Sequence, residues 1–167
     1  MGCFFCASTQ LLQLKKESQW MTPKFYNDPV FYVPEAAQVA GATEPAFRSM
    51  LARGGAKFIG LQRGGRTLFS CHELFIARLA VALSRYGLTG QAIWQTAYDF
   101  AGGDSGDAPE PDAHARIHHN DEGELVFEWS YTGEPLGPIA KPSLTIPTAA
   151  IWRDVVEQAA EIYAMGG

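Results

Sequence analysis

The segment from residue 33 to residue 55 is punctuated as two short helices separated by a three-residue turn. Pro34 stands at the first position of the first helix, where the missing N–H of proline costs nothing, and Gly41 ends that helix. Thr43 is a suitable N-cap for a second helix, which we expect to run to about Arg53 and to end at the glycines that follow. Two short helices joined by a turn that begins with glycine have the spacing of a helix-turn-helix.

A β-hairpin is predicted directly after the second helix. Two short apolar segments, 57–61 and 67–69, flank the pair Gly64-Gly65, which readily adopts the positive backbone angles of a tight hairpin turn. Arg63 and Arg66 stand on either side of these glycines. The sequence therefore predicts a small two-stranded wing with basic residues at its tip.

Two longer helices follow the hairpin. Ser70 and Glu73 have the spacing of a capping box, and they open an apolar-rich helix that closes at Gly87. Thr89 is the predicted N-cap of the next helix, which ends at Gly102. The predicted order is thus helix, turn, helix, hairpin, helix, helix.

The last third of the chain has a different composition. Glycine, proline and aspartate dominate residues 103–113, which lack apolar periodicity and are predicted to form an acidic linker. Strands are then predicted at 115–119 and 124–131 around a turn at 120–123, with alternating apolar residues in the second strand. After a proline-rich crossover, a final helix begins at Pro147 and carries an apolar stripe at helical spacing.

These elements define an α+β fold class, a winged helix-turn-helix followed by a small β-hairpin and a C-terminal helix. The predicted organisation has four parts. They are a flexible leader or start-site extension at 1–21, a winged helix-turn-helix domain at 22–102, the acidic linker at 103–113, and a hairpin-plus-helix region for dimerisation or partner binding at 114–167.

Charge is distributed unevenly along the chain, whose formal net charge is −5. Residues 1–100 carry ten Lys or Arg against six Asp or Glu, a balance of +4, whereas residues 101–167 carry three against twelve, a balance of −9. Neutralisation of phosphates supplies most of the non-specific affinity of proteins for nucleic acids. Only the first half of the chain therefore fits a nucleic-acid partner.

The compartment follows from hydropathy and from the three cysteines. No apolar run approaches the roughly 18 to 20 residues of a membrane span. An odd number of cysteines does not make a disulfide framework, and Cys3 and Cys6 form a C-x-x-C pair without a second pair of metal ligands. We therefore expect a cytoplasmic protein with no membrane partner, associated with the nucleoid if the source is bacterial.

The segment from Tyr32 to Arg48 resembles the MerR family and the related excisionase-type winged helices. It has an aromatic residue, a Glu-Ala-Ala first helix, a Gly-x-Ser/Thr-type turn and an arginine early in the second helix, and residues 66–70 (RTLFS) resemble the wing exit of the family. The resemblance implies a DNA-binding protein in which the helix at 43–53 enters the major groove and the wing at 57–66 contacts the backbone.

The chain also departs from the pattern of that family. Ser49-Met50 stands where the family has an aromatic pair, and no long dimerising coiled coil follows the fourth helix. The C-terminal cysteines of metal-sensing members have no counterpart. Induction by a metal or a drug is therefore not implied, and no cofactor is predicted.

Eight residues form the predicted DNA-binding site. The resemblance implies a phosphate contact for Arg48, and an arginine near the start of a helix in the major groove can reach the backbone. Glu44 can accept a hydrogen bond from cytosine or merely complement the helix dipole, and both roles stay open. No acidic residue occurs from position 46 to position 70, so the cations of this stretch form a basic cluster. The site residues are Thr43, Glu44, Ala46, Arg48, Arg53, Lys57, Arg63 and Arg66.

No catalytic or metal-binding constellation is predicted, and the chain is not expected to be an enzyme. His114 and His118 share one face of a predicted strand while His119 points away, and no carboxylate or cysteine stands at a ligand spacing, so the three are interpreted as polar strand residues. His72 and Glu73 are adjacent rather than one helical turn apart, so their spacing does not make an acid–base pair.

Double-stranded DNA is the predicted partner, for a transcriptional regulator or a phage-type architectural factor. A homodimer through the C-terminal helix is expected because one winged helix buries little surface on DNA. The alternative is a non-catalytic protein-interaction module whose acidic C-terminal half binds a partner. A third hypothesis is a ligand sensor with a pocket of Phe127, Trp129, Tyr131 and Trp152, although burial alone explains their apolar pattern.

Overall fold

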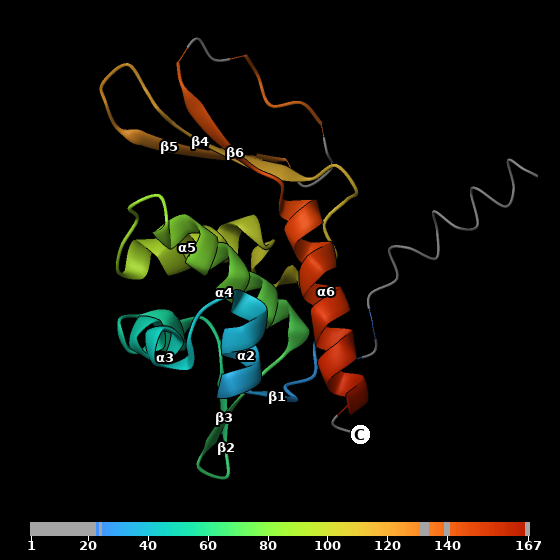
Figure 1. Cartoon of the computed structure of the whole chain (residues 1–167). Helices are drawn as coiled ribbons and strands as arrows, with labels where there is room; N and C mark the ends of the chain where they lie inside the picture. The colour runs from blue at the N-terminus through green and yellow to red at the C-terminus, as the bar shows by residue number, and fades with distance from the viewer. Residues whose placement is uncertain (1–22, 24, 131–133, 139–140, 166–167) are drawn as a thin grey trace, which may run out of the picture.

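The computed structural model describes residues 23, 25–130, 134–138 and 141–165, and the predicted leader at 1–21 lies outside them. The described residues form five α-helices and two three-stranded antiparallel sheets (Figure 1), which confirms the α+β fold class. The helices are α2 (Val33–Ala40), α3 (Glu44–Ala52), α4 (Cys71–Ser84), α5 (Gln91–Phe100) and α6 (Thr148–Met165). The strands are β1 (Phe31–Tyr32), β2 (Leu61–Arg63), β3 (Arg66–Phe69), β4 (His114–His119), β5 (Leu125–Ser130) and β6 (Ser143–Ile146).

The first sheet has the order β1-β3-β2 and contains the predicted hairpin. Gly64 and Gly65 have φ angles of 58° and 76°, the positive values that a two-residue hairpin turn requires, and Arg63 pairs with Arg66 across the turn. The glycine turn is thus confirmed. The first strand was predicted at 57–61, which is wrong, because β2 begins only at Leu61.

The segment before β2 forms a 3-10 turn, Gly55–Lys57, that packs against α5. A Cβ atom on Gly55 would lie 2.5 Å from the Trp94 side chain, so only glycine allows the backbone to approach the indole this closely. Ile59 is buried as well. The apolar run that resembles a strand therefore packs inward on a tryptophan, and the pairing with β3 starts later.

Helix α4 begins at the predicted capping box. The Ser70 hydroxyl accepts a hydrogen bond from the Glu73 N–H at 3.2 Å, and the Glu73 carboxylate accepts one from the Ser70 N–H at 2.6 Å. The second carboxylate oxygen accepts a bond from the Gly60 N–H at 2.7 Å, so the same side chain holds the backbone that leads into β2. Thr89, in contrast, does not cap α5, because the N-cap is Gly90 with a φ of 68° and a ψ of −146°.

Helix α4 is buried along most of its length and forms the centre of the molecule (Figure 1), with α2, α5 and α6 packed around it. We expected the last helix to cover the predicted hairpin or to pair with a second copy. Its buried residues Trp152, Val155 and Ala159 belong to the common core, and α6 packs mainly against α2 and α4. None of the helices in the described residues is both long enough and apolar enough to cross a membrane.

The second sheet has the order β5-β4-β6 and so contains one strand more than the predicted hairpin. The additional strand β6 lies in the expected crossover, where Leu144 pairs with Ile117 and Ile146 with Ala115. Its four residues are too few to show an alternating pattern, which explains why the sequence did not reveal it. Both β5 and β6 are antiparallel to β4 and lie on its two sides. The connection from β5 to β6 therefore passes over the central strand β4.

Helices cover only part of the inner face of this sheet. The Phe100 ring of α5 lies 6.4 Å from that of Phe127 and 6.0 Å from that of Trp129. Trp152, which we considered together with these aromatics for a pocket, packs instead on Tyr26, with the ring centroids 6.0 Å apart. The described aromatics therefore belong to two separate contacts, and Tyr131 lies outside the described residues.

A buried chain of hydrogen bonds connects distant parts of the sequence. The Trp152 indole N–H donates to the Tyr26 hydroxyl at 2.8 Å, the hydroxyl lies 3.2 Å from Nδ1 of His72, and Nε2 of His72 lies 3.1 Å from the Gly103 carbonyl oxygen. A neutral imidazole with its proton on Nε2 satisfies every group, since it donates to the carbonyl and accepts from the hydroxyl. Burial lowers the pKa of His72 and so favours this neutral form.

Candidate nucleic-acid interface

Helix α3 places one side chain fully in the core, and Met50 and Leu51 pack against it partly buried. Phe47 is its only fully buried residue, and its ring lies 5.8 Å from that of Phe69 in β3. Thr43, Ala46 and Arg48 are exposed. The helix therefore keeps a solvent-facing side on which the predicted contact residues of its first turns are displayed.

The turn between α2 and α3 depends on a glycine and on an arginine from α4. Gly41 has a φ of 74°, and a Cβ atom there would lie 2.3 Å from Nη1 of Arg78. The same guanidinium donates to the Val39 carbonyl at 3.1 Å and pairs with Asp154 of α6 at 3.0 Å. Arg78 thus satisfies a carbonyl at the end of α2, a role that the sequence did not reveal because the two residues are far apart in the chain.

The first turn of α3 contains an exposed ion pair. Nη2 of Arg48 lies 2.7 Å from the Glu44 carboxylate, and the two side chains are 58% and 41% exposed. The Thr43 hydroxyl accepts a hydrogen bond from the Ala46 N–H at 3.4 Å, as expected of an N-cap. Glu44 therefore partly offsets the charge of Arg48 in the free protein, and a phosphate contact by Arg48 competes with this pair.

The hairpin presents its two arginines side by side. Arg63 and Arg66 face each other across the turn, and both are exposed. The Arg66 guanidinium lies 5.7 Å from the centroid of the Tyr32 ring, within the range of a cation–π contact. Tyr32 was not among the predicted site residues, since only the pairing of β1 with β3 brings it beneath Arg66.

Arg53 and Lys57 lie on the chain between α3 and the hairpin, and both are exposed. Nε of Arg53 donates to the Ser49 carbonyl at 3.2 Å, while Lys57 ends the 3-10 turn. Within the described residues, no carboxylate forms an ion pair with either of them or with the two hairpin arginines. Four of the five cations in the acid-free stretch therefore keep their full charge for an external anion.

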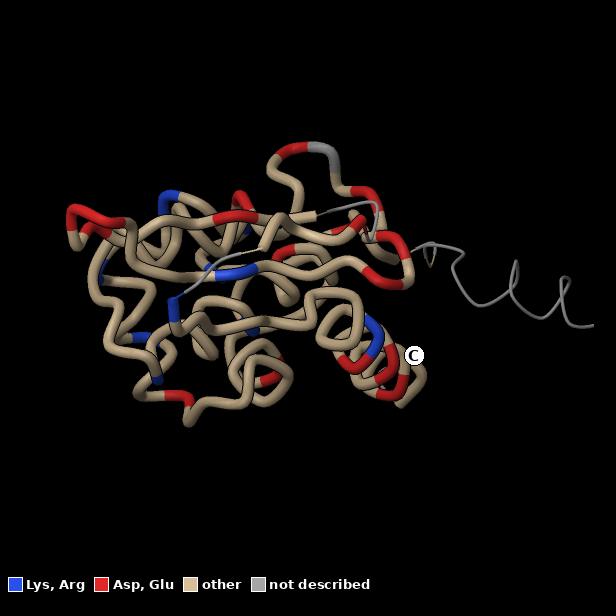
Figure 2. Tube along the Cα trace, turned by 90° about the horizontal axis from the view of Figure 1, so that it is seen from above, with Lys and Arg blue, Asp and Glu red and all other residues tan. Residues whose placement is uncertain are grey.

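The second sheet lies at the opposite end of the molecule from the hairpin (Figure 1), and acidic positions gather around it (Figure 2). Two of its cations are already paired, Arg116 with Glu128 at 2.8 Å and Lys141 with Asp121 at 2.7 Å. The hydrogen bond from Arg116 lowers the pKa of the Glu128 carboxyl, and that from Lys141 lowers the pKa of Asp121. The hairpin arginines and the acidic positions around the second sheet thus lie at opposite ends of the molecule.

The histidines of β4 do not come together as a ligand set. His118 lies 3.2 Å from the Glu128 carboxylate, and strand alternation places His119 on the opposite face of the sheet. Across the described part of the chain, no group of three or more histidine, cysteine, aspartate or glutamate side chains is arranged to hold a metal ion.

The structure thus brings the eight predicted residues onto α3, the connection that follows it, and the hairpin, with seven of them exposed and Glu44 partly so. In comparisons with known proteins, the chain matches no protein-family model and no curated protein.

Proposed function

We propose that this protein binds double-stranded DNA sequence-specifically through a winged helix-turn-helix, as a transcriptional regulator or an architectural factor. In this proposal α3 is the recognition helix in the major groove, and the β2–β3 hairpin is the wing that contacts the phosphate backbone. The order of β1, α2, α3, the hairpin, α4 and α5 supports it, together with the three-residue turn at Gly41.

The observation that carries the proposal is the set of exposed cations without carboxylate partners. Arg53, Lys57, Arg63 and Arg66 lie on consecutive surface elements, and no acidic residue interrupts positions 46–70. Backbone affinity for DNA depends on such uncompensated charge, because each phosphate contact releases counterions. If these cations served solubility alone, the residues between them would not need to exclude aspartate and glutamate.

A single module of this kind buries too little surface for tight binding, so dimers or tandem copies are part of the proposal. The apolar stripe of α6 offers less area for this than its sequence indicates, because Trp152, Val155 and Ala159 are buried within the chain. Tyr163 and Met165 are 50% and 79% exposed, and they are the large apolar side chains of α6 that a second copy could cover.

Salt dependence of DNA binding tests the electrostatic part. If four cations contact phosphates, a plot of the logarithm of the binding constant against the logarithm of the salt concentration has a slope of about −3.6. The double substitution Arg63→Ala/Arg66→Ala makes this slope shallower by about 2. The matched control Lys141→Ala/Arg153→Ala removes the same charge elsewhere, Arg153 being an exposed residue of α6, and should leave the slope unchanged. A flat dependence for the unmodified protein, or equal losses in both variants, would contradict the proposal.

Selection of bound duplexes from a random pool tests specificity. Glu44→Gln weakens the ion pair with Arg48, so we expect stronger binding to mixed-sequence DNA and a changed base preference at one position. A recovered palindrome would establish two-fold assembly. Recovery of no preferred sequence from the unmodified protein would exclude sequence-specific binding.

A second candidate function is favoured by the acidic half. Residues 101–167 carry a charge balance of −9, and Arg116 and Lys141 are already engaged in ion pairs with Glu128 and Asp121. This surface fits a basic protein partner. Binding of a lysine-rich peptide that is weakened by Glu122→Gln/Glu124→Gln, without any salt-dependent DNA binding, would favour this function over the first.

A further inference from the structure

A cleft of about 480 Å³ opens between the second sheet and the connection from α4 to α5. Tyr86 and Leu88 from the connection form one wall. Ile117, Leu125 and Leu144, one from each strand of the sheet, form the other wall. The cleft thus occupies the part of the inner sheet face that Phe100 of α5 does not reach.

Large apolar side chains border this cleft without being covered. Leu125 is 47% exposed and Tyr86 is 58% exposed. Leu125 shares a strand face with Phe127 and Trp129, but the contacts of Phe100 are made with those two residues. A concave site of this volume lined by apolar residues has the dimensions of a small-molecule pocket, for which about 300–1,000 Å³ is usual.

The chemistry of the lining restricts the ligand. The lining residues include no aspartate, glutamate, lysine or arginine, and Nε2 of the lining residue His118 already lies 3.2 Å from the Glu128 carboxylate. A charged ligand would therefore lose its hydration here without gaining a free counter-charge. Tyr86, His119 and Ser143 contribute polar side chains, and among the described residues none of these side chains is engaged in a hydrogen bond. They can bind a polar group of an otherwise apolar molecule.

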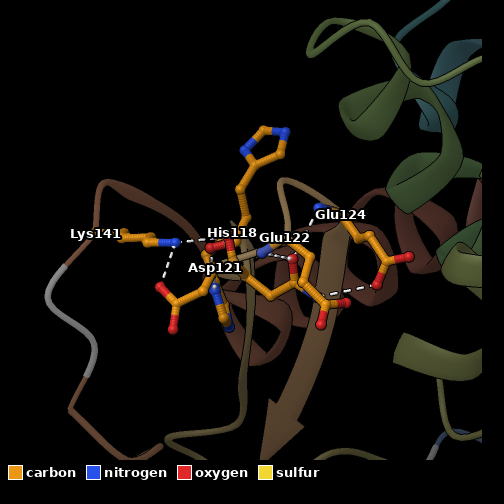
Figure 3. A network of polar contacts seen from close by, with 7 residues as sticks. His118, Asp121, Glu122, Glu124 and Lys141 are labelled. Carbon is orange, nitrogen blue, oxygen red and sulfur yellow. Dashed lines mark hydrogen bonds and ion pairs between the residues drawn. The ribbon is translucent and has the colours of Figure 1, made fainter.

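Polar contacts hold the strands that carry the lining. The Asn120 side-chain oxygen accepts bonds from the N–H groups of Glu122 at 3.0 Å and Glu124 at 2.8 Å. Lys141 donates to the Asn120 carbonyl at 2.6 Å and pairs with Asp121 at 2.7 Å (Figure 3). These contacts join the β4–β5 turn to the chain entering β6, so Leu125 and Leu144 are positioned before any ligand arrives, which lowers the entropic cost of binding.

We propose that this cleft is a binding site for a small, uncharged, largely apolar molecule that carries one hydrogen-bonding group. A second copy of the chain is the less suitable occupant, because a specific protein interface needs about 800 Å² per partner, and the cleft is a concavity of small-molecule size. The proposal does not depend on DNA binding.

Titration of the full chain with Nile red tests it, because this uncharged apolar dye fluoresces more strongly away from water. We expect saturable binding of one dye per chain, with shifts of the amide NMR signals of Ile117, Leu125 and Leu144. Leu125→Glu should weaken dye binding at least about tenfold, because it places a charge in the apolar lining. The anionic dye anilinonaphthalene sulfonate should bind more weakly than Nile red.

Trp129→Glu is the matched control, since Trp129 has the same exposed fraction, 47%, on the same face of the same strand but does not line the cleft. It should change the affinity for Nile red by less than about twofold. Tyr86→Ser provides a second variant on the other wall, for use if Leu125→Glu perturbs the circular dichroism spectrum. Absence of saturable binding, equal loss in the control, or a dimer that dissociates in Leu125→Glu would overturn the proposal.

Discussion

Replacing Tyr26 by phenylalanine removes a single oxygen atom from the centre of the buried hydrogen-bond chain. The Tyr26 side chain is 1% exposed and that of Trp152 2% exposed, so water does not readily replace the lost hydroxyl. The indole N–H loses its acceptor at 2.8 Å, and Nδ1 of His72 loses its donor at 3.2 Å. The shape of the core is otherwise retained, so the change in the free energy of unfolding measures the contribution of these hydrogen bonds.

The expected loss follows from the two hydrogen bonds that the Tyr26 hydroxyl makes to buried groups. Each buried polar group that loses its hydrogen bond costs about 1–3 kcal/mol, and the longer bond to His72 belongs at the lower end of that range. Tyr26→Phe should therefore lower the free energy of unfolding by about 2–4 kcal/mol, a large fraction of the ~5–15 kcal/mol typical of a domain. The melting temperature should fall by about 4–16 °C for a chain of this size.

Urea unfolding at pH 7.5, followed by tryptophan fluorescence and circular dichroism, measures this loss. The midpoint should shift while the dependence on urea concentration stays the same, because the surface exposed on unfolding is unchanged. Tyr98→Phe is the control, since its hydroxyl bonds to Asp104 at an exposed site and should contribute less than about 1 kcal/mol. A Tyr26→Phe protein within about 0.5 kcal/mol of the unmodified chain would show that the network does not stabilise the fold.

Further predictions concern His72, two glycines and Cys71. Because the folded-state pKa of His72 lies below its ordinary 6.5, the unfolded chain binds the proton first, so stability present above pH 6.5 is lost as the pH falls toward the folded pKa. His72→Gln should remove this slope below pH 6.5 in urea titrations, and an unchanged slope would assign it to other groups. Gly65→Ala meets no atom within 4 Å but keeps a φ of 76°, so it should cost about 1–2 kcal/mol through backbone strain alone. Gly55→Ala clashes with Trp94, so its urea midpoint should fall further than that of Gly65→Ala, and the reverse order would contradict the close approach. Burial raises the pKa of the Cys71 thiol to about 12, so in a Cys3→Ser/Cys6→Ser background a thiol reagent should label the chain only after unfolding, and rapid labelling of the native protein would disagree with this burial.

Local signals in the sequence were sufficient for the ends of α2 and α3 and for the start of α4. Gly41, Thr43 and the Ser70–Glu73 box act within one helical turn, so their backbone consequences can be read from spacing, and the structure has the helix ends and the cap where these residues predict them. The hairpin turn at Gly64-Gly65 is local in the same sense. The positions of Arg48, Arg63 and Arg66 were predictable in the same way, because these cations are carried by the second helix and the hairpin turn.

Tertiary structure alone decided the features that depend on residues far apart in the chain. Strand β6 exists because β4 offers it an edge, Lys57 lies in a turn because Gly55 packs on Trp94, and Arg66 lies over Tyr32 because β1 pairs with β3. The apolar stripe of α6 was equally compatible with a dimer and with an intramolecular core, since periodicity identifies a buried face but not what buries it. The sequence thus determined the caps at Thr43 and Ser70, the end of α2 at Gly41 and the glycine turn, because these signals act within a few residues. Long-range packing determined which surfaces remain exposed, including the basic site and the cleft at the second sheet.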